Sequence, residues 1–392
     1  MKKKIVSLAM AALLAATAVA GCGGSNTAAS SSKAAAGGDT FKIGSIGPST
    51  GGAALYGTAV MQGAQIAVDE INAAGGINGK QIEFKWADDE HDAEKSVNAY
   101  NSLKDWGMQI LMGTVTTTPC IAVTDKTAAD NMFQITPSAS SADVIAKDNV
   151  FQVCFTDPNQ GVASAKYISD NKLAKKVAVL YNTSDVYSKG IYEKFIATAK
   201  EQKEFEVVAE EAFTDDTKTD FSAQLGKFKT AGADLVFLPF YYQEASVVLK
   251  QAKDMSYAPK FFGVDGMDGI LDLENFDKSL AEGVILLTPF VADAKDEKTQ
   301  KFVKAYKEKY NSVPIQFAAD AYDAIYIIKA AAEAEKLTPD KSVADINTAL
   351  KKAITALSFD GLTGTGMKWG ADGAVNKDPK AMVIKDGAYT AM

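Results

Sequence analysis

The residues best suited to chemistry in this sequence follow five of the strands that its pattern predicts. Hydroxyl, tyrosine and carboxylate side chains gather at 113–118, 137–141, 184–187, 241–242 and 265–266. Open parallel sheets bind ligands beyond the carboxyl ends of their strands, where helix N-termini present free N–H groups. Hydroxyls and helix N-termini suit a carboxylate, an acidic side chain suits an ammonium group, and tyrosine faces suit an apolar body. The clusters together predict a ligand-binding site.

Each cluster also has a purely structural interpretation. Thr and Ser residues that follow a strand are common helix N-caps. Tyr187 and Tyr241, taken singly, are of a type that often packs half-buried, and Asp265 alone suits a turn or a cap. Compatible chemistry at five strand ends nevertheless favours a binding site over five unrelated structural roles.

The elements that must position these clusters alternate between strand and helix from residue 41 onward. Amphipathic stretches such as 60–71, with apolar residues at helical spacing, separate short apolar runs. Strict alternation predicts parallel sheets with helices on both faces. About eleven strands are too many for one ordinary open sheet, so we expect an α/β fold with two doubly wound parallel-sheet lobes. The main strands are predicted at 41–47, 82–86, 109–112, 133–136, 150–155, 176–181, 207–213, 235–240, 261–264 and 284–287.

Composition excludes several classes of protein. All 41 basic residues are Lys, and the net charge is −8. Such a chain repels a phosphate backbone and lacks the bidentate guanidinium of nucleic-acid readers, so we expect no nucleic-acid partner. The one histidine, His91, argues against a multi-His metal site and a Ser-His-Asp device. Because no set of nucleophile, base and orienting group is visible, we expect neither an enzyme nor a cofactor.

Two other motifs suggest chemistry but do not fit it. The acidic run 88–92 lacks the spacing of a Ca²⁺ loop and is expected to be a solvated loop. The Gly-rich segment 44–52 matches neither G-x-G-x-x-G nor G-x-x-x-x-G-K-[ST], which argues against nucleotide binding. The sequence also lacks the G-x-S-x-G nucleophile elbow, the usual sign of a hydrolase.

The first 22 residues resemble a bacterial lipoprotein signal peptide. A lysine-rich start precedes an apolar stretch at 5–20 that is too short for a comfortable membrane span. The sequence V-A-G-C then ends at Cys22, as in a lipobox, where the peptide is cut before the Cys and its sulfur carries lipid. Residues 23–40 are rich in Gly, Ser and Ala and predict a flexible tether. We therefore expect an extracytoplasmic protein that is lipid-anchored to the bacterial cell membrane.

The two remaining cysteines, Cys120 and Cys154, lie in apolar contexts. Such contexts favour buried free thiols over a disulfide, although the sequence does not show whether the two residues approach each other.

Five motifs carry a resemblance to a known family over nearly all of the chain from Phe41 to about Gly387. The chain resembles the bacterial branched-chain amino-acid binding proteins, the leucine/isoleucine/valine receptors of ABC importers, which have the type I periplasmic-binding-protein fold. The resemblance implies two lobes that close on an amino acid through three crossovers near residues 158, 289 and 366. Lobe 1 would be 41–158 plus 289–366, and lobe 2 would be 159–288 plus 367–390. The motifs are GGAALYG at 51–57, DEINAAGGING at 69–79, ITPSAS at 135–140, FTDPNQG at 155–161 and AYDA at 321–324.

The resemblance also assigns roles in the site. Thr116, Thr117 and Ser140, with nearby main-chain N–H groups, would hold the α-carboxylate. The Ser138 carbonyl and the Asp265 carboxylate would hold the α-ammonium group, and the tyrosines would line and clamp the pocket. Asp stands at 265 where Glu is usual, which shifts the carboxylate by about one methylene and bears on ligand choice. The predicted ligand-binding residues are Tyr56, Thr116, Thr117, Ser138, Ala139, Ser140, Tyr187, Tyr241, Asp265 and Tyr322.

Four functions follow from these expectations, in decreasing order of support. The first is a monomeric, lipid-anchored receptor that captures a branched-chain or other aliphatic amino acid and delivers it to ABC permease subunits. The second is a receptor of the same fold for an amide, urea or an aromatic acid, although Asp265 favours a ligand with an ammonium group. The third is a ligand-sensing subunit that reports to a membrane kinase. The last is an extracytoplasmic enzyme.

Overall fold

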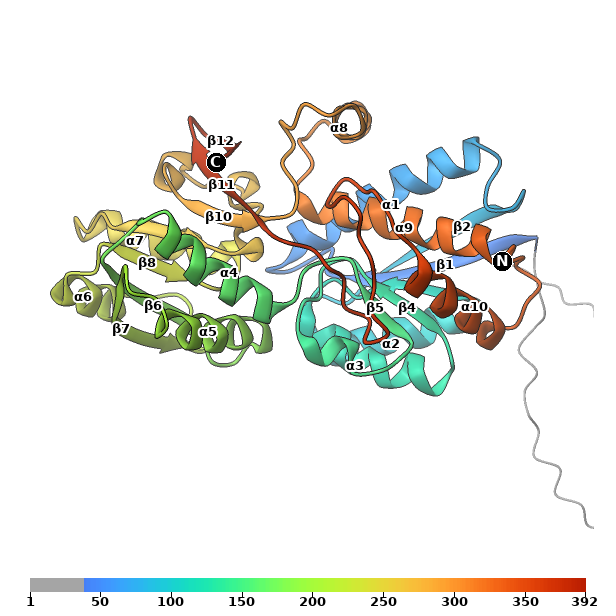
Figure 1. The fold of residues 1–392 in the computed structure, drawn as a ribbon, viewed down its shortest axis with the longest axis horizontal. Coiled ribbons are helices and arrows are strands. Elements are labelled where there is room, and N and C mark those ends of the chain that lie inside the picture. The colour runs from blue at the N-terminus through green and yellow to red at the C-terminus, as the bar shows by residue number, and fades with distance from the viewer. Residues whose placement is uncertain (1–38) are drawn as a thin grey trace, which may run out of the picture. The chain divides into compact units, whose positions relative to one another are not determined.

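The computed structural model describes residues 39–392. They form an α/β fold with two sheets, each flanked by helices (Figure 1). None of the helices in this range is long and apolar enough to cross a membrane. The predicted signal peptide, the lipobox Cys22 and nearly all of the predicted tether lie outside the described residues.

The first sheet has five parallel strands in the order β2-β1-β3-β4-β5. The register places Ile43 of the first strand opposite Ile110 of the third. The third and fourth strands are buried throughout, as expected for central strands that helices cover on both faces, although the fourth carries the polar residues Gln134 and Thr136. The strands are β1 (Thr40–Gly47), β2 (Gln81–Asp88), β3 (Ile110–Gly113), β4 (Phe133–Thr136) and β5 (Val150–Gln152).

Six α-helices pack with this sheet, and we call sheet and helices together lobe 1. The helices at 54–73 and 316–334 pack closely. Gly63 permits this approach, since a Cβ atom there would lie only 2.0 Å from the carbonyl oxygen of Ala318. Ser342 and Asp92 cap two of the helices, where their side chains accept hydrogen bonds from first-turn N–H groups. The helices are α1 (Ala54–Ala73), α2 (Ala93–Asp105), α3 (Thr117–Ala129), α8 (Glu297–Tyr310), α9 (Gln316–Ala334) and α10 (Val343–Ala356).

The second sheet has seven strands in the order β12-β11-β10-β9-β8-β6-β7. Four helices pack with it, and together they form lobe 2. The strands are β6 (Lys176–Asn182), β7 (Glu206–Phe213), β8 (Leu235–Leu238), β9 (Lys260–Gly263), β10 (Ile285–Thr288), β11 (Lys380–Lys385) and β12 (Ala388–Ala391). The helices are α4 (Asp157–Asp170), α5 (Val186–Ala199), α6 (Ser222–Ala231) and α7 (Tyr242–Asp254).

Two strands of the second sheet depart from the predicted parallel arrangement. β11 runs antiparallel to β10, and β12 antiparallel to β11. The turn between β11 and β12 consists of Asp386 and Gly387, both with positive φ, at 52° and 71°. A two-residue Asp-Gly turn of this kind joins antiparallel strands, so it fixes the hairpin at this edge. The remaining strands of both sheets are parallel, as predicted.

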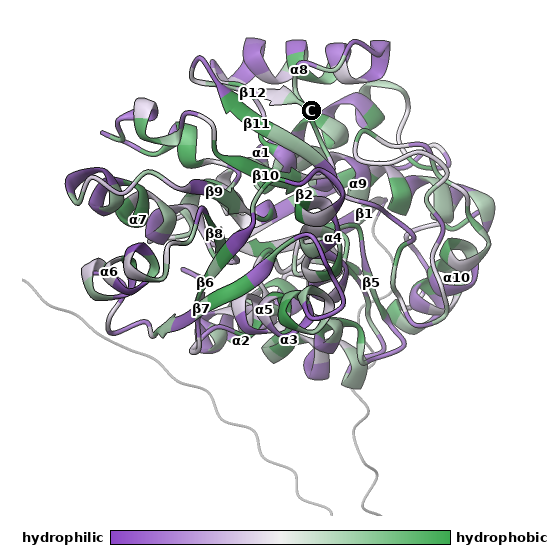
Figure 2. Ribbon diagram, turned by 60° about the vertical axis from the view of Figure 1, so that its left-hand side comes forward, coloured by the Kyte–Doolittle hydropathy of each residue, from purple (hydrophilic) through white to green (hydrophobic). Residues whose placement is uncertain are grey.

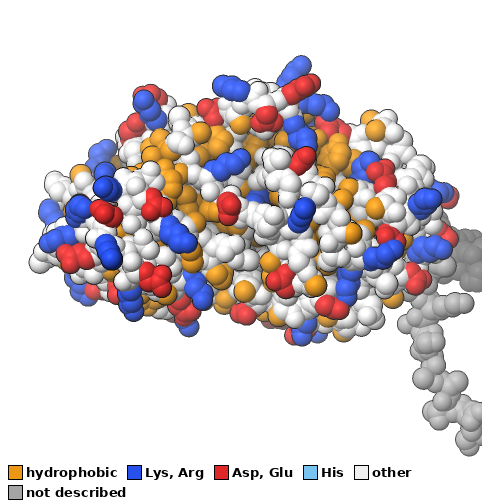
Figure 3. Space-filling view, viewed as in Figure 1, with side chains coloured by type: hydrophobic (Ala, Val, Ile, Leu, Met, Phe, Trp, Pro, Cys, Tyr) orange, Lys and Arg blue, Asp and Glu red, His pale blue; other side chains and the backbone are white. Residues whose placement is uncertain are grey.

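The hydrophobic core follows the sheets, and charge covers the outside. In Figure 2, β10 and β11 are green, whereas α6 and α7 show green and purple side by side, as expected for helices with one buried face. On the face shown in Figure 3, lysines and acidic side chains are interspersed. That face therefore carries no large field of a single sign.

The segment before β11 stays with lobe 1 for longer than the resemblance implies. The indole Nε1 of Trp369 donates to the carbonyl of Gln152 at 2.7 Å, and the backbone N–H of Gln152 donates to the carbonyl of Gly373 at 3.0 Å. Nζ of Lys377 donates to the carbonyl of Val153 at 2.9 Å. The third crossing therefore lies after Lys377, rather than near residue 366.

Cys120 and Cys154 are both buried and free, which confirms the preferred interpretation of the sequence. The Gln134 amide donates to Sγ of Cys120 at 3.3 Å. Burial raises the pKa of Cys120 to about 12, so this thiol stays protonated and unreactive.

Candidate ligand-binding site

Side chains that follow strands of both sheets meet around one enclosed space, which we call the cleft. Its free volume is about 10 Å³, roughly the size of one water probe. A larger ligand therefore has to enter while the two lobes are apart. The lining residues are Tyr56, Val115, Thr116, Thr117, Ser138, Tyr187, Tyr241, Asp265, Gly266 and Phe317.

Thr116 and Thr117 stand where β3 leads into α3. Thr116 is the N-cap residue of α3, but its hydroxyl makes no capping hydrogen bond. That hydroxyl lies 2.8 Å from Nδ1 of His91 instead. The first N–H groups of a helix have no partner within the helix, and the helix dipole adds to their attraction for an anion. The start of α3 therefore suits a carboxylate, and the alternative of a capping hydroxyl is not observed.

The segment after β4 brings a third hydroxyl to the cleft. Ser138 lines it and donates from Oγ to the carbonyl of Val115 at 2.7 Å. Ala139 and Ser140 are buried but are not among the lining residues. The Ala139 carbonyl accepts a hydrogen bond from Gln152 at 2.8 Å. The Ser140 hydroxyl has no hydrogen-bond partner within residues 39–392, but it lies close enough to the carboxyl of Asp157 to lower the pKa of that group.

Lobe 2 contributes a tyrosine and a carboxylate that hold each other. The hydroxyl of Tyr187 donates to Oδ1 of Asp265 at 2.5 Å and accepts from the Gly266 amide at 2.9 Å. Asp265 is 4% exposed, and burial raises its pKa to about 7. The ring of Tyr241 stacks on that of Tyr187, with centroids 4.9 Å apart. The result is a buried acid set beside aromatic faces, which suits an ammonium group attached to an apolar body.

Contacts between the lobes surround this pair. Tyr56 of α1 donates from its hydroxyl to the carbonyl of Gly266, and its ring meets that of Tyr241 edge to face at 5.5 Å. At the start of α9, the side-chain amide of Gln316 donates to the carbonyl of Asp265 at 2.7 Å. Each of these contacts joins lobe 1 to lobe 2, so the structure represents a closed arrangement.

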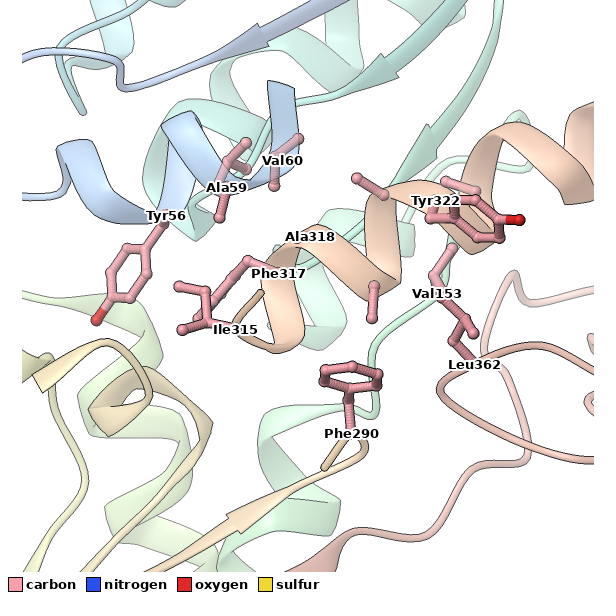
Figure 4. Packing of buried hydrophobic residues seen from close by; sticks show 14 of the residues in the cluster. Tyr56, Ala59, Val60, Val153, Phe290, Ile315, Phe317, Ala318, Tyr322 and Leu362 are labelled. Carbon is pink, nitrogen blue, oxygen red and sulfur yellow. The ribbon is translucent and has the colours of Figure 1, made fainter. Parts of the chain in front are cut away.

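Tyr322 is the predicted site residue that the structure places elsewhere. Its hydroxyl donates to Oε2 of Glu70 at 2.7 Å, within the packing of α1 against α9. Figure 4 shows it well apart from Tyr56 along α9, with Phe317 lying nearer to Tyr56. The two α9 residues are five positions apart, which is about 7.5 Å along a helix axis. Phe317, and not Tyr322, is therefore the α9 side chain that lines the cleft.

Asp157 is a second acid that sequence reasoning did not single out. It is the first residue of α4 and is 1% exposed, and neither of its carboxylate oxygens has a hydrogen-bond partner in the described chain. Burial raises its pKa well above the usual range, and the charge of Asp265 raises it further. The strand ends suggest Asp265 as the only acid of the site. The structure places a second acid, Asp157, nearby. The position of Asp157 at the start of a helix that follows a strand is the sequence feature that could have identified it as a site residue.

The acidic run 88–92 is only partly the solvated loop that the sequence predicts, because Glu90 and Asp92 are exposed but Asp89 and His91 are not. Asp89 is fully buried, and its Oδ1 accepts from the backbone N–H of His91 at 2.9 Å. Burial raises the pKa of Asp89 to about 7. His91 is half-buried, because the turn packs against the start of α3. The prediction is wrong for these two residues, since contacts with a distant segment are not visible in local composition.

Comparison with known proteins agrees with this geometry. A family model of the periplasmic binding proteins matches residues 40–388, so the chain belongs to the periplasmic binding protein family. Leu/Ile/Val-binding protein homolog 3 of Brucella melitensis is 31% identical over 303 residues, which are 76% of this chain and 80% of that protein. The chain is thus a solute-binding protein, of a family that works outside the cytoplasm.

Two solved structures extend the comparison. One is the branched-chain amino acid transporter substrate binding protein LivJ from Streptococcus pneumoniae in complex with isoleucine; it is 31% identical, with a TM-score of 0.81, and the match covers 90% of this chain and 98% of that one. The other is an ABC transporter solute binding protein from R. palustris in complex with benzoate, 22% identical, with a TM-score of 0.79 and coverage of 90% and 95%. The first supports the type I fold and the branched-chain class, and the second shows the fold alone.

Proposed function

We propose that this protein is the substrate receptor of an ABC importer and that it binds a branched-chain or other aliphatic amino acid between its lobes. The observation that carries the proposal is the pairing of Tyr187 with Asp265 in the same cleft as the hydroxyls of Thr116 and Thr117. The buried acid would take the α-ammonium group. The hydroxyls and the start of α3 would take the α-carboxylate.

The remaining site residues complete this assignment. The Ser138 carbonyl would share the ammonium group with Asp265, and Asp157 would add negative charge on the same side. The aliphatic side chain would lie among Tyr56 and Phe317. A carboxylate held by neutral hydroxyls and helix N–H groups needs no guanidinium, which agrees with a sequence that contains no Arg.

The site disfavours an aromatic acid such as the benzoate of the R. palustris protein. Such a ligand brings a carboxylate without an ammonium group, so the buried Asp265 and Asp157 would have to stay protonated and would gain no charged partner from it. A ligand with an ammonium group compensates both. This difference favours an amino acid over the alternative ligand class.

Two further proposals concern the location and the state of the protein. We propose that Cys22 carries lipid and anchors the protein on the outer side of the cytoplasmic membrane, as its lipobox-like context suggests. We also propose that it acts as a monomer, because both halves of the cleft come from one chain.

Thermal unfolding against the twenty amino acids and benzoate tests the ligand class. A ligand present at 100 times its Kd stabilises the folded state by about 2.7 kcal/mol. We expect this stabilisation from leucine, isoleucine or valine. Stabilisation by benzoate and by none of the amino acids would contradict the proposal.

A further inference from the structure

His91 is the only histidine of the chain, and it lies directly beside the cleft. Its Nδ1 atom is 2.8 Å from Oγ1 of Thr116, a lining residue. Its ring meets the ring of Tyr241 edge to face, with centroids 5.8 Å apart. One imidazole therefore touches a hydroxyl of lobe 1 and an aromatic ring of lobe 2.

The direction of the hydrogen bond between His91 and Thr116 decides what the hydroxyl offers to a ligand. A hydroxyl has one proton and two lone pairs, and each nitrogen of a neutral imidazole either donates or accepts. If Nδ1 is unprotonated, the Thr116 hydroxyl donates its hydrogen bond to His91 and presents only lone pairs to the cleft. If Nδ1 carries hydrogen, it donates to Thr116, and the hydroxyl proton is free to point at a carboxylate oxygen.

We propose that His91 is a positioning residue of the ligand site: it holds the Nδ1–H tautomer, donates to Thr116 and directs the Thr116 proton to the ligand carboxylate. The inference rests on the proposed function, because it requires a carboxylate at the start of α3. His91 acts through Thr116 and does not itself touch the ligand.

The surroundings of His91 keep its imidazole neutral, so the tautomer sets the direction of the bond. Burial lowers the pKa of His91, and the charge of Lys218, from the loop between β7 and α6, lowers it further. Asp215 of the same loop and Asp92 of its own segment act in the opposite direction. Tyr241 adds no charge, because burial raises its pKa well above the usual range.

The backbone at His91 allows a matched pair of variants. Its φ is 63°, in the left-handed region that Asn and His adopt more readily than most residues. The turn is held by a hydrogen bond from the backbone N–H of His91 to Oδ1 of Asp89, which a change of the His91 side chain leaves in place. His91→Asn places an amide nitrogen about as far from Cα as Nδ1 and tolerates this φ. His91→Phe keeps a ring against Tyr241 but removes the donor.

Nuclear magnetic resonance of ¹⁵N-labelled protein saturated with isoleucine reads the tautomer directly, because the chain has one imidazole. We expect a protonated Nδ1 and a bare Nε2 at pH 7.5. A bare Nδ1 in the saturated complex would overturn the inference and leave the proposed function intact. Failure of the wild-type protein to bind any amino acid would remove both.

Calorimetry with the variants supplies the second measurement. We expect His91→Phe to weaken isoleucine binding by roughly tenfold to a hundredfold, the effect of losing one hydrogen bond to a charged group. His91→Asn should restore most of that loss. In a Thr116→Val background, His91→Phe should have little further effect. An equal loss in both backgrounds would show that His91 does not act through Thr116 and would overturn the inference.

Discussion

The hydroxyl of Tyr187 donates a 2.5 Å hydrogen bond to Oδ1 of Asp265, and both side chains are buried. The Gly266 amide, which donates to the same hydroxyl at 2.9 Å, fixes the direction in which the tyrosine proton points. The hydrogen bond that orients the carboxylate therefore lies within lobe 2. A site that is organised in advance binds more tightly, because less conformational freedom is lost on binding.

Replacing the acid should abolish most of the binding. Asp265→Asn leaves a ligand ammonium group buried without a countercharge, so we expect amino-acid affinity to weaken by roughly 2–5 kcal/mol. Isothermal calorimetry on the folded variant measures the change. The matched control is Asp254→Asn, which removes an exposed acid of the same lobe and should leave the affinity unchanged. Equal affinity of Asp265→Asn and wild type would return Asp265 to the role of a turn residue.

Ligand binding should release protons near neutral pH. Burial raises the pKa of Asp265 to about 7 in the closed protein, from an ordinary value near 3.9. A raised folded pKa means that the closed state without ligand gains stability as pH falls below 7, because it takes up a proton there. An ammonium ligand requires the ionised form and expels that proton.

Calorimetry in buffers of different ionisation enthalpy detects such proton release. We expect release between about pH 5 and 7.5, accompanied by affinity that rises with pH over the same range. The release should shrink in the Asp265→Asn variant. Proton uptake at pH 6.5, or no proton exchange at all, would contradict the account of this carboxyl.

Residues 39–392 contain one ion pair with both side chains almost fully buried. We expect it to contribute strongly to the free energy of unfolding. Nζ of Lys377 lies 2.9 Å from Oδ1 of Asp320, with exposures of 1% and 2%. Lys377→Met leaves Asp320 buried and uncompensated, and we expect the free energy of unfolding to fall by about 3–5 kcal/mol. Urea unfolding measures this loss.

Two controls accompany the Lys377 variant. The double variant Lys377→Met with Asp320→Leu should recover much of the stability, because the orphaned charge is then gone. Lys80→Met breaks the exposed pair with Asp39 and should change stability by less than about 1 kcal/mol. Similar losses for Lys377→Met and Lys80→Met would show that the buried pair is unimportant.

Removing the predicted lipid attachment should release the protein from the membrane. Cys22→Ser deletes the sulfur that would carry lipid, and we expect a secreted product or an unprocessed precursor. A single acyl chain holds a protein only marginally, whereas two chains hold it stably. Membrane fractionation with immunodetection follows the protein. A variant that is still cleaved and still membrane-bound would contradict lipidation at Cys22.

The local pattern predicted most of the fold. The apolar run of β3 and the spacing in α1 are properties of adjacent residues, so the local pattern predicts them. The Asp386-Gly387 turn is also a local signal, but strict alternation of strand and helix predicts a parallel neighbour where this turn produces an antiparallel hairpin. The late third crossing depends on contacts of Trp369 with a segment more than 200 residues away, which no local pattern contains.

Seven of the ten predicted ligand residues line the cleft, and Ala139 and Ser140 are buried beside Ser138 without lining it. These positions follow strands or begin helices, which parallel sheets collect at one edge. The prediction for Tyr322 differs from the structure, because only the first turn of α9 reaches the cleft. Phe317 lies in that turn, whereas Tyr322 contacts Glu70. His91 was missed because its partner Thr116 belongs to a different strand end, 25 residues away.

The central claim is that the cleft recognises both ends of an amino acid, and three related ligands test it in one calorimetric experiment. Isoleucine carries both groups, 3-methylpentanoic acid lacks the ammonium group, and 2-methylbutylamine lacks the carboxylate. We predict that isoleucine binds one to one and that each analogue binds at least about a hundredfold more weakly, since each leaves buried polar groups unpaired. Binding of 3-methylpentanoic acid as tight as that of isoleucine would contradict the account, because Asp265 would then have no ammonium group to hold.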